Sequence, residues 1–590
     1  MKKMFVILMA LVVLTAAVAQ AGTDAEAKIK ELQKRIQKLE VKSATDRVKF
    51  TGEYRFEAHN ISSTLPDHYD GMALQNVMVN TMFFHQTTGG LPMNEMGEFL
   101  YGDVQNHIMS NSGDYMAWTQ GLSYDGVGGM MGEMLFDMGQ AGFIGQQVAG
   151  GMSYDDALVA WNGFTQSPDF AAFLGTVQEG AMGMMMAQDG VYREGYDWDN
   201  KIMYTSRLRL NMSAKVNDDV SFSGRLGMYK PWGDSSGVQV FNGQSNTMNI
   251  DGNSTSVPNS DILRVDRAYF NWKNFLNTPA YLSIGRRPSA GGPPLHLRQD
   301  EMRAGTPLGT IIDFQFDGIT VGYNEFLWEE STLRACYGVG YESGFGSGEQ
   351  LKSAADRMKD CSFFGFNWDL YSNEESFVQA TVARAFDVTD GFNGVVVMPN
   401  DPLSGNAMPG PMVIRYTPSA NLGDIDLASF LVMRKTENLD LFASYSLMKS
   451  HPEEGVGTPF GGLFCNPYEV AEEQDGNMLY LGARMHMPNG KTKVGIEYNK
   501  GSQYWFNFAS AADDIIAPKT STRGSVIEAY VTHRIGKGFI GKLDYMKYNY
   551  DYSGSGWHLG APQDMDGTPI LGFPTYDEAS KLSISLIARF

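Results

Sequence analysis

The feature that most constrains this chain is an alternation of apolar and polar residues with a period of two, which recurs along most of its length. The segments 47–59 and 580–590 show it most clearly: apolar side chains occupy nearly every second position, and Lys, Arg, Glu, Thr and Ser occupy most of the others. Successive side chains of a β-strand point to opposite faces, so this pattern predicts strands with one apolar and one polar face.

The connections between these segments favour one architecture among the β folds. Short links of two to six residues alternate strictly with long connections such as 231–261, 288–308, 388–424 and 551–579. Tight turns at one end and long loops at the other are typical of outer-membrane barrels. The sequence therefore predicts an all-β fold, an antiparallel transmembrane β-barrel of about sixteen strands, with fourteen and eighteen left open. The predicted strands are 47–59, 202–216, 220–230, 262–273, 280–287, 309–326, 332–343, 361–371, 376–387, 425–435, 438–450, 477–487, 491–500, 524–534, 538–550 and 580–590.

One predicted strand, 309–326, has two interpretations. Its apolar phase shifts near Asp317-Gly318, where a hairpin could turn. A hairpin would break the alternation of short and long connections, whereas a β-bulge explains the shift within a single strand. We therefore predict one bulged strand here.

The N-terminus predicts export. Lys2 and Lys3 precede an uncharged apolar run from Met4 to Val18, and Ala19-Gln20-Ala21 offers a small-x-small cleavage pattern. We interpret residues 1–21 as a Sec signal peptide. No later run of 18 or more apolar residues exists, which excludes helical membrane spans but not a closed barrel. We expect the outer membrane of a Gram-negative bacterium, with its lipid as a partner.

Residues 22–46 are predicted to form a short periplasmic coiled-coil stalk. The 3–4 spacing of a heptad seam is followed by Ala25, Ile29, Leu32, Ile36 and Leu39. Such a stalk would associate subunits into a homo-oligomer. The alternative is a solvated amphipathic leader, because fewer than three heptads are marginal alone.

A large insertion, 61–200, separates the first strand, 47–60, from the rest of the barrel, 201–590. Between Phe56 and Tyr192 there is no Lys or Arg but there are fifteen Asp and Glu. This stretch therefore contributes −15 to the net charge of −21 of the whole chain. Connections of this length are rarely structureless, so the Met- and Gly-rich insertion is predicted to be a helical cap or plug. Its methionines could bind copper(I), but an adaptable apolar core is the preferred interpretation.

The basic residues predict the character of the pore. We expect a set of arginines and one histidine on polar strand faces, or in the bent loop 286–303, to line the lumen. In the alternative interpretation, which we slightly favour, these residues pair with lumenal acids such as Glu53, Asp266 and Asp369. The candidates are Arg55, Arg207, Arg209, Arg225, Arg286, Arg287, His296, Arg298, Arg303, Arg334 and Arg484.

No motif points to catalysis or to a bound cofactor. The three cysteines form no Cys-x-x-Cys, and there is no metalloprotease, nucleophile-elbow or phosphate-loop pattern. We expect no enzyme activity, no metal, no cofactor and no nucleic-acid partner.

Three stretches carry a family resemblance: 225–234, 264–272 and, most distinctively, 285–298. With them the chain resembles an uncharacterised family of porin-like outer-membrane barrels of Gram-negative bacteria that carry an N-terminal coiled-coil segment. The likeness covers roughly 200–590 together with the stalk and first strand. It implies a porin-like barrel, and because the family has no assigned activity it implies no functional residues.

These observations predict a channel for diffusive passage of small polar or ionic solutes, with weak anion preference. Two other functions stay open. The barrel could sheathe a multihaem cytochrome in an electron-transfer conduit, which co-purifying haem would reveal. The protein could also be a surface binding protein, in which the acidic insertion binds a partner and the barrel serves only as an anchor. In that case any conductance would be incidental.

Overall fold

The computed structural model describes most of the chain. It covers residues 32–37, 48–94, 98–122, 124–233, 260–342, 358–389, 393–396, 412–415, 420–453, 462–465, 470–509, 514–554, 558–572 and 575–590. The predicted signal peptide and most of the predicted stalk lie outside these residues, and residues 32–37 are helical.

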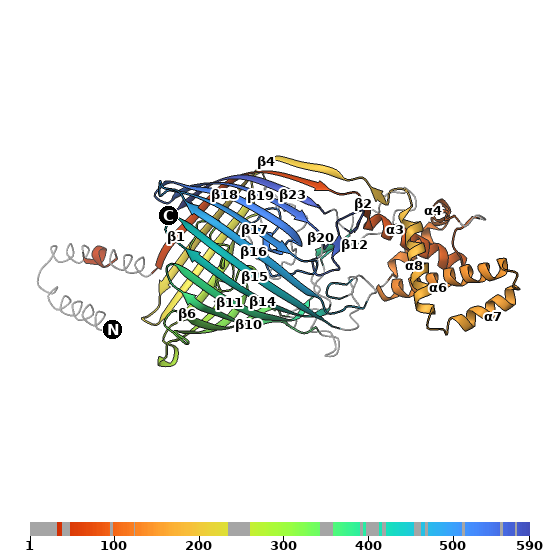
Figure 1. The fold of residues 1–590 in the computed structure, drawn as a ribbon, viewed down its shortest axis with the longest axis horizontal. Helices are drawn as coiled ribbons and strands as arrows, with labels where there is room; N and C mark the ends of the chain where they lie inside the picture. Colours follow the sequence, from red (N-terminus) through yellow and green to blue (C-terminus); the bar gives the residue numbers. More distant parts are fainter. Residues whose placement is uncertain are drawn as a thin grey trace, which may run out of the picture.

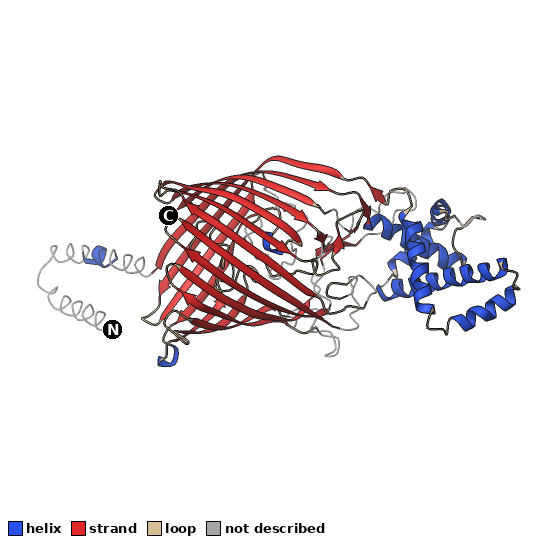
Figure 2. Ribbon diagram, viewed as in Figure 1, coloured by secondary structure: helices blue, strands red, loops and turns tan. Residues whose placement is uncertain are grey.

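Sixteen antiparallel strands close into a barrel, which confirms the predicted fold class and strand number (Figures 1 and 2). Each strand pairs with its neighbour along the chain, and pairing of the first strand with the last closes the wall. The strands are β1 (Val48–Leu65), β4 (Tyr196–Lys215), β5 (Val220–Pro231), β6 (Ser260–Trp272), β7 (Ala280–Arg286), β8 (Asp317–Asn324), β9 (Thr332–Tyr341), β10 (Cys361–Ser372), β11 (Ser376–Thr389), β14 (Asn421–Lys435), β15 (Leu439–Pro452), β16 (Asp475–His486), β17 (Thr492–Gly501), β18 (Gly524–Gly536), β19 (Phe539–Tyr550) and β23 (Glu578–Arg589).

The connections divide between the two ends of the barrel. Strand β1 begins and β23 ends at what we call the turn end, where all the short links lie, one of them with the 3-10 helix Phe275–Asn277 (Figure 1). The long connections lie at the opposite, loop end. Among their described residues are the short strands β12 (Asn393–Val396), β13 (Met412–Arg415), β20 (Tyr552–Ser553) and β21 (Gln563–Asp564).

The outer face of the wall carries an apolar belt of membrane dimensions. On β14, Ala428, Phe430 and Val432 face outward between the charged Asp426 and Arg434. These eight residue steps correspond to about 26 Å along the strand at about 3.3 Å each. For a strand tilted by about 40°, that is a height of about 20 Å, close to the roughly 25 Å apolar band of outer-membrane barrels. The belt is what a closed barrel needs to face lipid.

A charged row marks the loop-end border of this belt. Arg384 of β11, Asp426 of β14, Lys449 of β15 and Asp475 of β16 are direct cross-strand neighbours at one level. Arg384 and Asp426 form a two-pronged ion pair with a shortest distance of 2.5 Å. Opposite charges on neighbouring strands attract one another, so each charged side chain of this border has a neighbour of opposite sign.

The bulged strand predicted over 309–326 is wrong in its first half. Strand β8 starts only at Asp317, which pairs with Arg286 at the end of β7. The residues between these two strands, 287–316, leave the wall; we call them the inserted segment. Their alternating apolar residues resemble a strand because Ile312 and Phe314 are buried, but they are buried inside the barrel rather than against lipid.

The insertion between the first two barrel strands is a helical domain, as predicted, and lies beyond the loop end rather than within the wall (Figure 2). We call it the cap. It is tied to the barrel through a three-stranded sheet of β2 (His68–Asp70), β3 (Tyr192–Arg193) and β22 (Ile570–Leu571), the last of which belongs to the connection before β23. Its helices are α3 (Gly71–Thr88), α4 (Tyr101–Ser110), α5 (Ser112–Gln120), α6 (Tyr124–Ala149), α7 (Tyr154–Phe164) and α8 (Phe170–Met186).

The methionines of the cap form its core. Met82, Met134 and Met185 are buried, and six further methionines of α3, α6 and α8 pack against them. In the same domain burial raises the pKa values of Tyr101 and Tyr115, which hydrogen-bond to Asn80. Within the described residues, no group of three or more His, Cys, Asp or Glu is placed to hold a metal ion. No helix of the described part of the chain is long and apolar enough to cross a membrane.

Candidate functional site in the barrel lumen

Two of the long connections fold back into the barrel and meet there. The inserted segment meets residues 502–523, described as 502–509 and 514–523, which we call the second lumenal segment. The backbone N–H of Asp313 donates to the carbonyl of Phe508 at 2.6 Å, and the N–H of Phe508 donates to the carbonyl of Ile311 at 3.0 Å. Because the two segments are joined by backbone hydrogen bonds, they form one body inside the wall.

This body has an apolar core that is continuous with the wall of β10 and β14–β16. Trp505, Phe506 and Phe508 of the second lumenal segment are almost fully buried with Phe314 of the inserted segment. The ring of Phe508 lies 4.6 Å from that of Phe363 on β10, edge-on. Burial of each such side chain contributes about 1.5–3 kcal/mol, so the packing holds the body firmly against this side of the barrel.

Buried ion pairs fasten the same body to the wall of β17 and β18. Arg298 of the inserted segment donates to Asp514 at 2.5 and 3.1 Å and lies 3.3 Å from Glu528 of β18. Lys519, in the 3-10 helix Lys519–Ser521, donates to Glu528 and to Glu497 of β17. Lys519 is only 1% exposed, and its two carboxylates compensate for the loss of hydration.

The inserted segment reaches the turn end of the barrel. There Asp300 accepts from Arg484 at 3.2 Å and from Lys493 at 2.6 Å. The guanidinium of Arg589, at the end of β23, donates to the carbonyls of Gln299 and Asp300. The segment therefore extends through much of the depth of the lumen.

A second cluster of ion pairs joins the inserted segment to the wall at the turn end of β10 and β11. Arg303 of the inserted segment and Arg334 of β9 both bind Asp369 of β10, at 3.0 and 2.9 Å. The Arg303 guanidinium also lies over the ring of Phe377, 4.9 Å from its centroid. Gln379 completes the cluster with a hydrogen bond to Asp369 at 2.6 Å.

The opposite inner face, formed by β23, β1, β4, β5 and β6, is rich in arginine. Cross-strand neighbours on it include two pairs of like charge, Arg55 with Arg207 and Arg225 with Arg267. Like charges directly opposite one another destabilise a sheet unless other groups compensate. Six arginines of this face are Arg55, Arg207, Arg209, Arg225, Arg267 and Arg589, and Arg264 of β6 shares the face.

Four carboxylates lie against these six arginines. Glu53 pairs with Arg207 at 2.5 Å, and Asp266 pairs with Arg225. Glu57 pairs with Arg55 at 3.0 Å. The fourth is Glu301 of the inserted segment, which lies 3.5 to 4.0 Å from Arg207, Arg209 and Arg589. In this set of ten side chains the arginines outnumber the carboxylates by two.

The structure thus places the eleven predicted residues in four settings. Arg55, Arg207, Arg209 and Arg225 belong to the arginine-rich face, whereas Arg298, Arg303, Arg334 and Arg484 fasten the inserted segment. His296 is buried in the inserted segment. Arg286 lies 3.9 Å from Asp317, and Arg287 donates to Ser283 and Thr320.

The pairing that the sequence left as an alternative is present for all three acids that we named. Glu53, Asp266 and Asp369 each bind at least one arginine. Sequence reasoning missed Arg267 and Lys519. Arg267 sits at a bulge between Asp266 and Ala268, where strict alternation would place it on the outer face. Lys519 lies in a connection, where no periodic signal exists.

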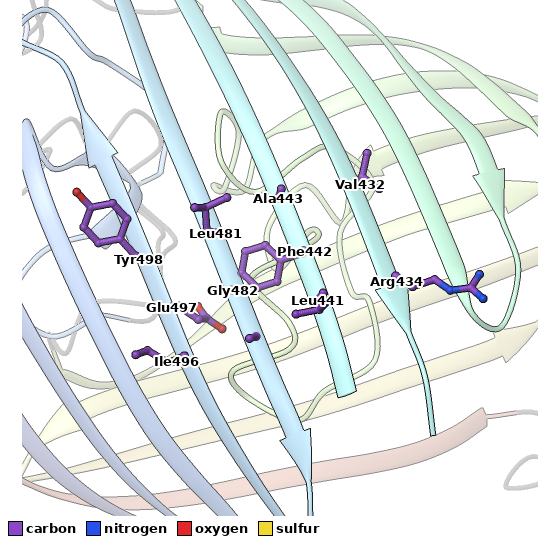
Figure 3. A pocket seen from close by; sticks show the side chains of 11 residues that line it. Val432, Arg434, Leu441, Phe442, Ala443, Leu481, Gly482, Ile496, Glu497 and Tyr498 are labelled. Carbon is purple, nitrogen blue, oxygen red and sulfur yellow. The ribbon is translucent and has the colours of Figure 1, made fainter. Parts of the chain in front are cut away.

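The wall also carries a groove on its outside, within the apolar belt. Figure 3 shows Leu441, Ala443, Leu481 and Ile496, whose outward side chains line a cavity of about 540 Å³ on β15–β17. The small Ala443 leaves the depression between larger neighbours. This groove faces lipid and lies on the other side of the wall from the lumenal charges.

The fold and its lumen define the class of protein: a closed sixteen-stranded β-barrel of the outer-membrane type, filled in part by its own connections. Residues 197–590 match the family described as protein of unknown function (DUF3373), and the chain belongs to that family.

Solved outer-membrane barrels are similar at low identity. OmpF of Salmonella typhi in complex with daunomycin is 11% identical with a TM-score of 0.37, over 68% of this chain and 93% of that one. OprB of Pseudomonas putida is 10% identical with a TM-score of 0.39, over 93% and 96%. OmpT of Vibrio cholerae is 12% identical with a TM-score of 0.34, over 66% and 92%. No curated protein matches the chain. At these scores the likenesses carry no functional argument.

Proposed function

We propose that this protein is an outer-membrane channel for diffusive passage of small polar solutes, with a weak preference for anions. The solutes move through the lumen beside the arginine-rich face of β1 and β4–β6, which the inserted segment contacts through Glu301 and the carbonyls of Ala290 and Ala304. The opposite side of the lumen is closed to them, because the lumenal segments pack there around a dry apolar core.

The excess of arginines over carboxylates on the arginine-rich face carries this proposal. The cap holds far more charge, of the opposite sign, but it lies beyond the loop end, where salt screens it over about 8 Å at physiological ionic strength. Lumenal charges act at shorter range and in a medium of lower effective dielectric. A few lumenal arginines should therefore outweigh many distant carboxylates.

The test is the reversal potential of single channels in planar bilayers under a salt gradient. Arg209 is the variant of choice because its side chain is 14% exposed and lies 4.0 Å from a carboxylate oxygen of Glu301. A unit charge about 10 Å from the ion path, at an effective dielectric of about 40, contributes about 0.8 kcal/mol. Arg209→Gln should therefore lower the anion-to-cation permeability ratio by roughly two- to four-fold.

Arg434→Gln is the matched control, since Arg434 faces outward and pairs with Glu375 at the turn end. Its reversal potential should equal that of the unmodified channel. A strongly cation-selective channel whose selectivity Arg209→Gln leaves unchanged would contradict the proposed path.

A further inference from the structure

A small cavity lies between the inserted segment and the wall of β4–β6. Its volume is about 50 Å³, and one water molecule needs about 10–15 Å³ of such space. Four arginines and one histidine contribute to its lining, against the two carboxylates of Glu301 and Asp313. The cavity therefore has room for a few water molecules or for one small ion, but not for a sugar or a nucleotide.

Several of the lining residues hold a buried nitrogen for which the described residues provide no hydrogen-bond partner. These atoms include Nε of Arg267, Nε of Arg298 and Nδ1 of His296. Arg298 is 2% exposed and His296 is 8% exposed. Most buried polar groups in proteins are satisfied, so unsatisfied nitrogens gathered around one cavity indicate a missing acceptor.

Among the described residues no carboxylate oxygen lies within salt-bridge distance of Arg267, and Asp266 and Glu301 act on its charge from farther away. Its Nη1 and Nη2 donate to the carbonyls of Ala304 and Ala290, at 3.2 and 3.0 Å, and no salt bridge to it occurs among the described residues. The adjacent Asp266 is bound by Arg225. A buried guanidinium that only carbonyls satisfy loses much of its hydration without a compensating charge.

The two lining carboxylates are engaged elsewhere. An oxygen of Asp313 accepts the backbone N–H of Gly291 at 2.6 Å. Glu301 lies near Arg207 and Arg589, at 3.6 and 3.5 Å.

From this arrangement we infer that the cavity is a binding site for one small inorganic anion of the size of chloride or bromide. The anion accepts hydrogen bonds from Arg267 and Arg298, and it favours the tautomer of His296 with the proton on Nδ1. It also places a negative charge closer to Arg267 than Asp266 or Glu301 does. The site goes beyond the proposed transport function, because a resident anion would hold the inserted segment to the wall even in a barrel that passes no solute.

Bromide is the probe, because its anomalous scattering locates it directly. Crystals of the full chain grown or soaked in sodium bromide should show one anomalous peak in the cavity, next to Arg267, His296 and Arg298. Arg267→Gln should reduce this peak at least several-fold, whereas Arg434→Gln, on the outer face, should leave it unchanged. Absence of the peak in the unmodified protein, or its full persistence in Arg267→Gln, would overturn the inference.

A second measurement does not depend on the folding of a variant. The unmodified protein is heated in chloride and in gluconate at equal ionic strength, and the loss of the compact barrel is followed by electrophoretic mobility. A ligand that binds only the folded state raises the midpoint, so chloride should raise it progressively with concentration, while gluconate, too large for the cavity, should not. Equal midpoints in the two salts would count against the site. Neither readout depends on conductance, so failure of the proposed channel function would be distinguishable from failure of the site.

Discussion

The charged residues of the lumen have two different roles. Arg298, Arg303 and Lys519 are matched by carboxylates and fix the lumenal segments. Arg209 and Arg267 belong to a face where positive charge exceeds negative. Residue type alone does not distinguish these roles, because an arginine on a polar strand face looks the same in sequence whether its partner is a carboxylate or a solute.

Lys519 provides a residue-scale prediction about stability. Replacing it with Met leaves Glu497 and Glu528 buried without their shared cation, which should destabilise the barrel by about 3–5 kcal/mol. Urea unfolding in lipid vesicles, followed by tryptophan fluorescence, measures the change. Lys547→Met is the matched control: Lys547 and its partner Glu578 are both largely exposed, and such pairs contribute about 0–1 kcal/mol. Equal losses in both variants would show that Lys519 is not the fastening we describe.

At the scale of elements, the inserted segment determines how open the barrel is. It leaves the wall after β7 and returns at β8, yet Arg286 and Asp317 at its two ends are direct cross-strand partners. The two strand ends therefore already face each other as in a hairpin. The wall at this point does not depend on the residues between them.

That geometry predicts the effect of removing the segment. Replacing residues 289–314 with a short Gly-Ser turn should leave a closed barrel and raise single-channel conductance several-fold, because this segment then no longer occupies the lumen. Conductance in planar bilayers and heat-modifiable mobility test the two parts separately. A folded barrel with unchanged conductance would mean that the segment does not restrict the path.

Removing the cap is the natural comparison. The cap lies beyond the loop end, so replacing residues 72–190 with a flexible linker should change conductance and selectivity little. A large increase in conductance on this deletion would show instead that the cap obstructs the channel.

The sequence predicted the wall well and its contents poorly, for a physical reason. Each strand can be recognised from its own sequence, because lipid on one side and a polar lumen on the other impose an alternation of apolar and polar residues with a period of two. The packing of two distant connections has no such signature: Arg298 and Asp514 meet across 216 residues. Ile312 and Phe314 even imitate a strand, since their burial inside the barrel produces the same alternation as burial in lipid would.

For the whole molecule, the alternation of links assigns each end of the barrel to one side of the membrane. We predict that the turn end faces the periplasm and the loop end faces outward, as in other barrels of this type. Epitope tags placed in 551–579 should be accessible to antibody on intact cells, whereas tags at Asn217 or Asn489 should be accessible only after lysis. The reverse pattern would invert the orientation, and equal access to both would argue against membrane insertion.

The predicted stalk also belongs to this scale. Replacing Ile29, Leu32, Ile36 and Leu39 with Ser should reduce the oligomer size measured by light scattering in detergent, while the barrel still folds, because stalk and wall bury separate surfaces. The same substitutions made at the intervening polar positions serve as the control. An unchanged mass would identify the segment as a solvated leader.

The cap has a practical consequence that follows from its composition. From Phe56 to Tyr192 it offers no lysine or arginine, so trypsin finds no bond to cleave between Arg55 and Arg193 and amine-reactive labels find no side chain to modify. Tryptic surface shaving and lysine-directed biotinylation would therefore fail to detect the cap, although it lies farthest from the turn end. Chymotrypsin, or oxidation of exposed methionines such as Met109, would detect it instead.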